Sequence, residues 1–89
     1  MMPRLGAHDE AAALEAVQLA LTEVGDGSTY VWHRHGGRLS GLVQPTQSFL
    51  DALGRVCRHL VLTLNDASRS RRAEGIACRL DDGGWQLDG

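Results

Sequence analysis

The chain has 89 residues, which is room for one domain, and its 11 acidic and 9 basic side chains leave a formal charge of −2. A domain of this size buries only about 60 to 65% of the surface that its unfolded chain exposes, so its core is small. The charge balance argues against a nucleic-acid partner, and no apolar stretch approaches the roughly 18 residues that a membrane span needs.

The first element that the pattern predicts is an N-terminal helix at about residues 9–24. This stretch is rich in Ala, Leu, Glu and Gln, lacks Gly and Pro, and repeats apolar residues such as Leu14 and Leu21 at helical spacing. Asp9 is the expected N-cap, and Gly25 is expected to end the helix in the left-handed conformation. The polar face is acidic, which favours a helix that covers a core over one that lies on a membrane.

After the helix, the pattern changes to five short runs that we expect to form β-strands. Gly, Asn, Asp and Ser residues typical of turns separate the runs. We therefore predict one α+β domain over residues 1–89, with the helix packed on a curled five-stranded antiparallel β-meander. Pro45 cannot donate a ladder hydrogen bond, so its strand is expected at an edge or with a bulge. The expected strands span residues 28–35, 38–49, 55–65, 70–80 and 85–88.

The two cysteines, Cys57 and Cys78, lie on either side of one predicted turn. If residues 66–69 form a four-residue hairpin loop, the two cysteines face each other across the strand pair. Opposed Cβ atoms lie about 4.5 to 5.5 Å apart, near the roughly 3.8 Å of a disulfide. Such a bridge would stabilise the fold by about 3 kcal/mol and would indicate an oxidising compartment. The alternative of two buried free thiols stays open, because the chain shows no signal peptide.

Side chains with catalytic or metal-binding chemistry form no recognisable motif. His33 and His35 project from one face of a strand, but no paired Cys-x-x-Cys or His-x-x-x-His element accompanies them. A thiol nucleophile would require Cys57 to be reduced beside His59. We therefore expect no enzymatic activity, no cofactor and no metal site.

Arginines follow both cysteines and also form one separate cluster. Arg58 and Arg79 are expected on the strand face opposite the cysteines, diagonally near each other. They could hold a carboxylate or a phosphate, but an ion-paired structural role is favoured. Arg69, Arg71 and Arg72 fall in a predicted turn and the strand after it, where charge is usually solvated.

Three ordered motifs, GLVQPTQSF, GRVCRHL and EGIACRLDDGGWQL, cover much of the strand region, and ALEAVQLAL precedes them. They resemble the pattern G-x-V-x-P-T, G-x-x-C-R and G-x-A-C-R-x-x-D-G-x-W in the C-terminal domain of the 17 kDa outer-membrane surface-antigen family of Gram-negative bacteria. The resemblance extends over nearly the whole chain. The residues at the motif positions are Gly41, Pro45, Thr46, Gly54, Cys57, Arg58, Gly75, Cys78, Arg79, Gly83 or Gly84, and Trp85.

The resemblance implies a cell-envelope protein, at the periplasmic face or in the outer membrane. Members are usually exported, are often anchored by a lipid on an N-terminal cysteine, and carry a glycine-zipper segment before this domain. This chain shows none of the three features, so the envelope location is expected if the chain is a domain excised from an exported protein. The resemblance supplies a location and a fold rather than a reaction.

Taken together, these features predict a non-enzymatic envelope module that acts through structural or protein–protein contact with a partner in the envelope. One alternative is a periplasmic inhibitor that presents a loop with Arg34 and Arg38 to an enzyme cleft. A second alternative is a small-ligand-binding sheet, which would need an open pocket lined by Trp32 and Trp85.

Overall fold

The computed structural model describes residues 7–34, 39–66 and 69–88. One helix and a five-stranded antiparallel sheet form an α+β fold, and the strands lie in the sheet in their order along the chain. The structure therefore confirms the predicted helix-on-meander fold. The elements are α1 (Ala7–Glu23), β1 (Tyr30–His33), β2 (Leu39–Leu50), β3 (Val56–Asp66), β4 (Arg69–Arg79) and β5 (Trp85–Asp88).

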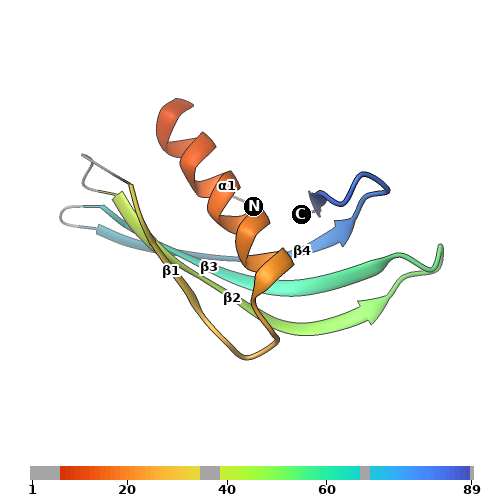
Figure 1. Ribbon diagram of the computed structural model, residues 1–89. Helices are drawn as coiled ribbons and strands as arrows, with labels where there is room; N and C mark the ends of the chain where they lie inside the picture. Colours follow the sequence, from red (N-terminus) through yellow and green to blue (C-terminus); the bar gives the residue numbers. More distant parts are fainter. Residues whose placement is uncertain (1–6, 35–38, 67–68, 89) are drawn as a thin grey trace.

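The helix lies across one face of the sheet, and the long strands β2, β3 and β4 bend around it (Figure 1). Side chains alternate between the two faces of a strand, so every second residue of β3 points toward the helix. The core lies between these two layers, and no described helix or strand covers the other face of the sheet. The buried core residues are Ala13, Ala16, Val17, Ala20, Leu21, Trp32, Leu39, Val43, Leu60, Leu62, Leu64, Ala77 and Trp85.

The buried face of α1 consists mainly of alanine. Val17 and Leu21 are buried as their spacing predicts, but Leu14 is 36% exposed. The alanines at three buried positions keep the helix close to the sheet, because an alanine side chain is a single methyl group. The sequence pattern gave the leucines too much weight and the alanines too little.

Both predicted ends of the helix differ from the structure. The helix begins at Ala7, so Asp9 lies inside its first turn and is not the N-cap. After the last turn, positive φ belongs to Gly27, at 87°, and not to Gly25. Val24 still donates a helical hydrogen bond to the Ala20 carbonyl, and the Gly27 N–H donates to the Pro45 carbonyl of β2, so a tertiary contact holds the residue with positive φ.

The alignment of β3 with β4 is the register that the predicted turn at residues 66–69 implied. Cys57 lies opposite Cys78, and the ladder continues to Asp66 opposite Arg69. The register is as predicted, but the loop is shorter than the four residues that we expected, because Asp66 and Arg69 are already paired. The two residues between them lie outside the described residues.

Strand β2 is internal to the sheet and carries an irregularity at its proline. Its register against β3 shifts between Pro45 and Gln47. The bulge that was expected as one solution for Pro45 is therefore present. Past this point the strand continues to Leu50 and enters the turn to β3.

One glycine of β2 allows a close approach of two strands. Gly41 lies opposite Trp32 of β1, and an added Cβ at this position would lie 2.7 Å from Trp32 Nε1 and 2.7 Å from the Thr63 carbonyl oxygen. No side chain larger than hydrogen fits there without movement of backbone. The glycine therefore positions the Trp32 ring over the core.

Candidate functional site

The two cysteines form one disulfide between β3 and β4. Cys57 Sγ and Cys78 Sγ lie 2.11 Å apart, and the two Cα atoms are 4.0 Å apart. Both residues are buried although they lie on the sheet face away from α1. No free cysteine is present in the described residues, so the free-thiol alternative and a thiolate nucleophile do not fit this structure.

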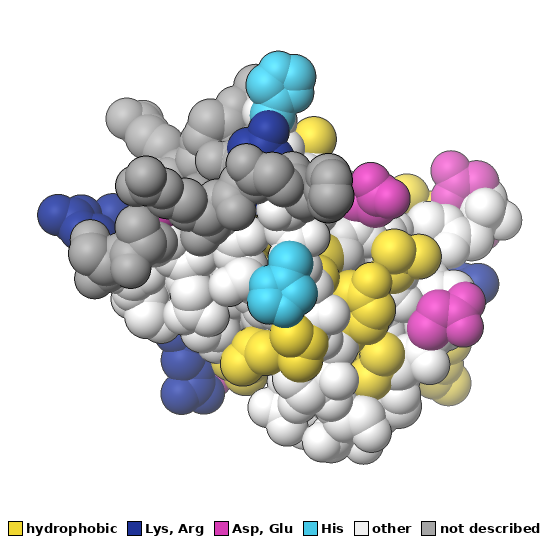
Figure 2. Space-filling view, turned by 60° about the vertical axis from the view of Figure 1, so that its left-hand side comes forward, with side chains coloured by type: hydrophobic (Ala, Val, Ile, Leu, Met, Phe, Trp, Pro, Cys, Tyr) yellow, Lys and Arg dark blue, Asp and Glu magenta, His cyan; other side chains and the backbone are white. Residues whose placement is uncertain are grey.

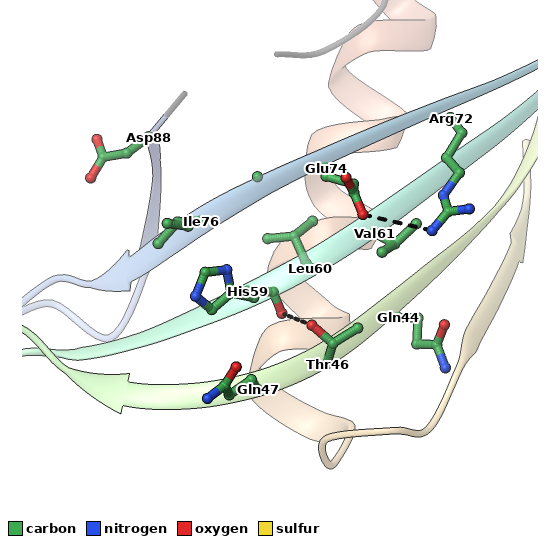
Figure 3. A pocket seen from close by; sticks show the side chains of 11 residues that line it. Gln44, Thr46, Gln47, His59, Leu60, Val61, Arg72, Glu74, Ile76 and Asp88 are labelled. Carbon is green, nitrogen blue, oxygen red and sulfur yellow. Dashed lines mark hydrogen bonds and ion pairs between the residues drawn. The ribbon is translucent and has the colours of Figure 1, made fainter.

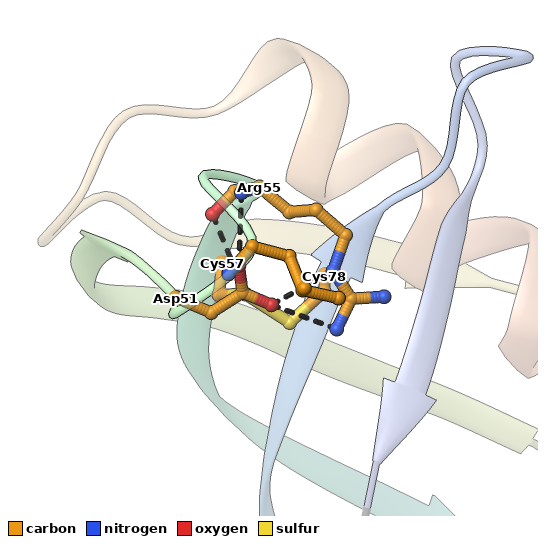
Figure 4. Close-up of a disulfide and its surroundings, with 5 residues drawn as sticks. Asp51, Arg55, Cys57 and Cys78 are labelled. Carbon is orange, nitrogen blue, oxygen red and sulfur yellow. Dashed lines mark hydrogen bonds and ion pairs between the residues drawn. A yellow bond between two sulfur atoms is a disulfide. The ribbon is translucent and has the colours of Figure 1, made fainter.

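The turn between β2 and β3, next to the disulfide, is held by Asp51 (Figure 4). Its Oδ1 accepts hydrogen bonds from the backbone N–H groups of Leu53 and Arg55, both at 2.9 Å. Its Oδ2 accepts from Arg55 Nε at 2.7 Å and lies 2.7 Å from Arg55 Nη2. Gly54 completes the turn with a φ of 79°, which a glycine adopts without strain.

These contacts favour the charged form of the Asp51 carboxyl. The backbone N–H of Arg55 is the largest cause that lowers the pKa of Asp51, and the Arg55 side chain adds to it. The Asp51 carboxylate also lies near both disulfide sulfurs. The sulfurs are bonded to each other and are not thiolates, so this group of three residues is unsuited to a metal ion.

Arg58 connects β3 to the end of the helix. It is 8% exposed and donates from Nη1 to the Leu21 carbonyl at 2.6 Å. Its Nη2 and Nε donate to Asp26 Oδ1 at 2.7 and 3.2 Å. The Leu21 carbonyl is one of the last four of the helix, which have no partner within the helix. Arg58 thus caps α1 and holds the following loop to the sheet.

Asp26 is the charged partner in this connection. The Arg58 guanidinium holds the pKa of the Asp26 carboxyl below its ordinary value, and the Ser48 hydroxyl, which donates at 3.1 Å, acts in the same direction. The carboxylate is therefore ionised at neutral pH. Sequence reasoning did not identify Asp26, because its partner lies 32 residues away in the chain.

Arg79, the arginine after the second cysteine, has a different environment. It is exposed, and its Cζ lies 5.5 Å from the centre of the Trp85 ring. This is a cation–π distance. Arg58 and Arg79 lie on the same face of the strands, but the structure gives the two guanidinium groups different partners.

Trp85 is held by the helix through Gln18. Its backbone N–H donates to Gln18 Oε1 at 2.8 Å, and its carbonyl accepts from Gln18 Nε2 at 2.7 Å. The Trp85 Nε1 donates to Thr22 Oγ1 at 3.3 Å. The Gln18 side-chain amide thus makes the two hydrogen bonds that the backbone of a neighbouring strand would make with Trp85. Nothing local in the sequence indicated this pair.

The remaining motif positions have mainly backbone roles. Pro45 accepts a hydrogen bond from the Gly27 N–H at 2.8 Å, and Thr46 Oγ1 donates to the His59 carbonyl at 3.5 Å. Gly83 has a φ of 90° in the turn between β4 and β5. Gly75 lies opposite Leu60 on β4.

Some predicted site residues lie at the opposite end of the molecule or beyond the described ranges. Arg34 follows β1, and its N–H donates to the Leu39 carbonyl at 3.0 Å. Arg38 and His35 lie outside the described residues. Trp32 and Trp85 both belong to the packed core, so the open pocket between them that ligand binding would need is not found among the described residues.

Exposed apolar side chains gather at the end of the sheet that carries the disulfide. On the face shown in Figure 2, hydrophobic side chains form a broken band across the middle, beside histidine and acidic side chains. The most exposed large apolar side chains lie at the disulfide end, where Leu53 is 80% exposed and Leu50 is 69% exposed. Leu50 lies opposite Val56, which is also exposed, and Leu80 follows β4 at the same end.

The reason for this exposure is the length of the strands. Leu50 and Val56 lie on the same sheet face as Arg58, which is the face that α1 covers. Arg58 already reaches the last turn of α1, so the strands continue past the end of the helix. We call Leu50, Leu53, Val56 and Leu80 the apolar end.

A shallow groove of about 600 Å³ lies on the sheet face away from the helix (Figure 3). His59 and Ile76 lie in it side by side, on β3 and β4. Phe49 of β2 packs near it, with its ring centre 5.2 Å from that of His59. Arg72 and Glu74 border the groove on β4, and their side chains approach to 3.7 Å.

No helix of the described residues has the length and apolar character to cross a bilayer. Residues 19–86 match the family described as 17 kDa outer membrane surface antigen. The chain is 31% identical over 70 residues to the 17 kDa surface antigens of Rickettsia bellii (strain RML369-C) and Rickettsia conorii (strain ATCC VR-613 / Malish 7). It is 30% identical over 70 residues to the 17 kDa surface antigen of Rickettsia prowazekii (strain Madrid E).

In these three comparisons the alignment covers 79% of this chain and 44% of the relative. The chain therefore spans less than half the length of these relatives. No solved structure matches the chain.

Proposed function

Because the chain belongs to the 17 kDa outer membrane surface antigen family, as its motifs predicted, we propose that it is a non-enzymatic module of the bacterial cell envelope that acts by binding another protein. The family name and the surface-antigen relatives support the envelope location. The disulfide agrees with it, because disulfides persist in oxidising compartments such as the periplasm. The partner is a protein of the same compartment.

The observation that carries the proposal is the apolar end. Four large apolar side chains lie exposed at one end of the sheet, and two of them are on the face that is covered by α1 elsewhere. An exposed apolar patch with polar surroundings is typical of a protein–protein contact. The disulfide and the Asp51–Arg55 pair hold this end in one conformation, which reduces the entropy cost of binding.

The charges near the apolar end favour a protein over a lipid surface. Asp81 and Asp82 are exposed directly after Leu80. The exposed Arg79 precedes Leu80, so one positive charge stands against two negative ones, and the net negative charge is unfavourable at an anionic membrane surface. A protein partner can place polar or basic groups opposite them.

Several of the side chains that could do chemistry here are engaged in holding the fold. The cysteines are joined, Asp26 is paired with Arg58, and Asp51 is paired with Arg55. These contacts support a binding module rather than a catalyst.

The experiment is site-specific crosslinking in the envelope of a producing cell. A photoreactive residue replaces Leu53 in one variant and Val31, which is 57% exposed on β1, in the matched control. We expect a discrete crosslinked protein from position 53 and none from position 31. Leu50→Gln, combined with the photoreactive residue at position 53, should remove the same product while it changes the free energy of unfolding by less than about 0.5 kcal/mol, as for other surface substitutions. Equal labelling at both positions, or no product at position 53, would contradict the proposal.

The inhibitor alternative is decided in the same experiment. A crosslinked partner that survives Leu50→Gln and is lost in Arg34→Ala would show that the β1 end of the molecule makes the contact. The ligand-binding alternative required one pocket lined by both tryptophans, whereas Trp32 borders a surface hollow of about 230 Å³ that Trp85 does not line.

A further inference from the structure

One edge of the sheet is left open by the short last strand. Strand β5 pairs with only the last part of β4, from Ile76 to Arg79. Residues 69–75 of β4 are paired with β3 on one side, and no described strand lies on their other side. This open edge of β4 is seven residues long, close to the usual length of a whole strand.

The register shows which backbone groups this edge offers. Cys57 and Cys78 are a closely spaced pair, with 4.0 Å between their Cα atoms, and this spacing is typical of a non-hydrogen-bonded pair in an antiparallel ladder. Hydrogen-bonded pairs alternate with such pairs, so the odd-numbered residues of β4 bond to β3. The N–H and C=O groups of Ser70, Arg72 and Glu74 therefore point outward from the edge.

The edge is also the most basic stretch of the described chain. Arg69, Arg71 and Arg72 are all exposed, while the whole chain carries a formal charge of −2. Arg72 approaches Glu74 at 3.7 Å, and both side chains are mostly exposed. Within the described residues, Arg69 and Arg71 make no ion pair. Because neighbouring side chains alternate between the faces, Arg71 and Arg72 place positive charge on both sides of the edge.

The groove described above lies beside this edge. Arg72, Glu74 and Ile76 border it on β4, and Asp88 of β5 borders it where β5 ends (Figure 3). A strand added along the edge would place every second side chain next to this groove. Main-chain hydrogen bonds would supply affinity and the groove would supply selectivity, as in other cases of strand addition.

We propose that the open edge of β4 binds an extended acidic segment of a partner protein as an added strand. A second copy of this chain is disfavoured, since pairing two such edges brings arginines next to arginines; charged edges commonly prevent self-association in this way. A segment with Glu or Asp at alternate positions would place its carboxylates beside Arg69 and Arg71 on one face and its other side chains beside the groove. This binding is independent of the apolar end, and its failure would leave the proposed contact there untouched.

The test uses a seven-residue peptide of alternating Glu and Val with blocked ends, and a control peptide in which every Glu is replaced by Lys. We expect the acidic peptide to bind at least about tenfold more tightly than the basic one, by fluorescence anisotropy at low salt. The amides of Ser70, Arg72 and Glu74 should become protected from hydrogen exchange in the complex. Equal binding of the two peptides, or no new protection at these amides, would overturn the proposal.

Two substitutions at one position separate backbone pairing from charge. Glu74→Pro removes an outward N–H without breaking the ladder to β3, and Glu74→Gln removes only a negative charge. We expect Glu74→Pro to weaken binding by at least about tenfold and Glu74→Gln to strengthen it by about twofold. A loss in neither variant, or the same loss in both, would contradict strand addition.

A modified peptide provides the same information without a change in the protein. Methylation of the peptide amides that face β4 removes their donors and leaves the charge intact, so binding should be lost if the backbones pair. Sedimentation of the free protein tests whether a second copy of this chain binds at the edge instead. Dimerisation that protects the same amides without peptide would assign the edge to a second copy and overturn the proposal.

Discussion

The cysteines of the two Cys-Arg dipeptides form one disulfide, but the two arginines that follow them differ in burial and in their partners. Arg58 is 8% exposed and makes three hydrogen bonds, to Asp26 and to the Leu21 carbonyl. Arg79 is exposed and lies against the ring of Trp85. Arg58 is on the central strand beneath the end of α1, whereas Arg79 lies at the end of β4. The position of each arginine relative to the helix therefore determines its burial and its partners, and the shared Cys-Arg sequence does not.

We expect the largest loss of stability when the disulfide between the two dipeptides is removed. Replacing Cys57 and Cys78 together by alanine should lower the free energy of unfolding by about 3 kcal/mol, because the unfolded chain regains the freedom of a loop with a separation of 21 residues. Urea denaturation measures this loss. The wild-type protein under reducing conditions is the control and should show a similar loss. An unchanged denaturation midpoint in both would mean that the bridge does not constrain the unfolded chain.

We expect the next largest loss of stability when Arg58 is replaced. Arg58→Met keeps most of the buried side-chain volume but leaves the Leu21 carbonyl and Asp26 without their donor. We expect a loss of about 2 kcal/mol in the free energy of unfolding. Arg58→Lys should recover part of it through a single charged contact. A loss no larger than that of an exposed arginine would remove the distinction between the two sites.

The second arginine should matter much less. Arg79→Gln removes an exposed cation–π contact, which is worth about 0.5 to 1 kcal/mol. Denaturation under the same conditions as for Arg58→Met gives the comparison directly. If Arg79→Gln costs as much as Arg58→Met, then the stacking on Trp85 is part of the core after all.

The dependence of stability on acidic pH should also differ between the Arg58 and Arg79 sites, by a smaller amount. The pKa of Asp26 is lowered in the folded protein, so its contribution to stability is present above the ordinary value of 3.8 and is lost as the pH falls below it. Asp26→Asn should therefore flatten the fall in stability below about pH 4, whereas Arg79→Gln should leave the slope unchanged. Carboxyl titration by NMR in Arg58→Met should show the Asp26 pKa moving back up. An Asp26 pKa that does not respond to Arg58→Met would contradict the pairing.

The meander and its register were predictable because they depend on local signals. Turn residues separate the strands, and the predicted turn at residues 66–69 implied the register that brings Cys57 opposite Cys78. The bulge at Pro45 followed from the missing N–H of proline. The end of the helix was misplaced because Gly25 and Gly27 are both suited to a reversal, and only tertiary contacts select between them.

The contacts that define the candidate site were less predictable. Asp26 and Arg58, and likewise Gln18 and Trp85, are far apart in the chain, and no periodicity links the members of either pair. The alanine face of α1 was missed because spacing counts large apolar residues and does not measure how closely two layers pack. The apolar end depends on where the helix stops relative to the strands, which no local pattern encodes.

The bidentate contact of Gln18 with the Trp85 backbone joins the first element of the fold to the last. The final strand cannot fray alone, because releasing its first residue also breaks its hydrogen bonds to Gln18 and Thr22 of the helix. Opening of β5 and loosening of α1 should therefore occur as one event. The hydrogen-exchange rate of the Trp85 amide should therefore report on whether α1 is folded.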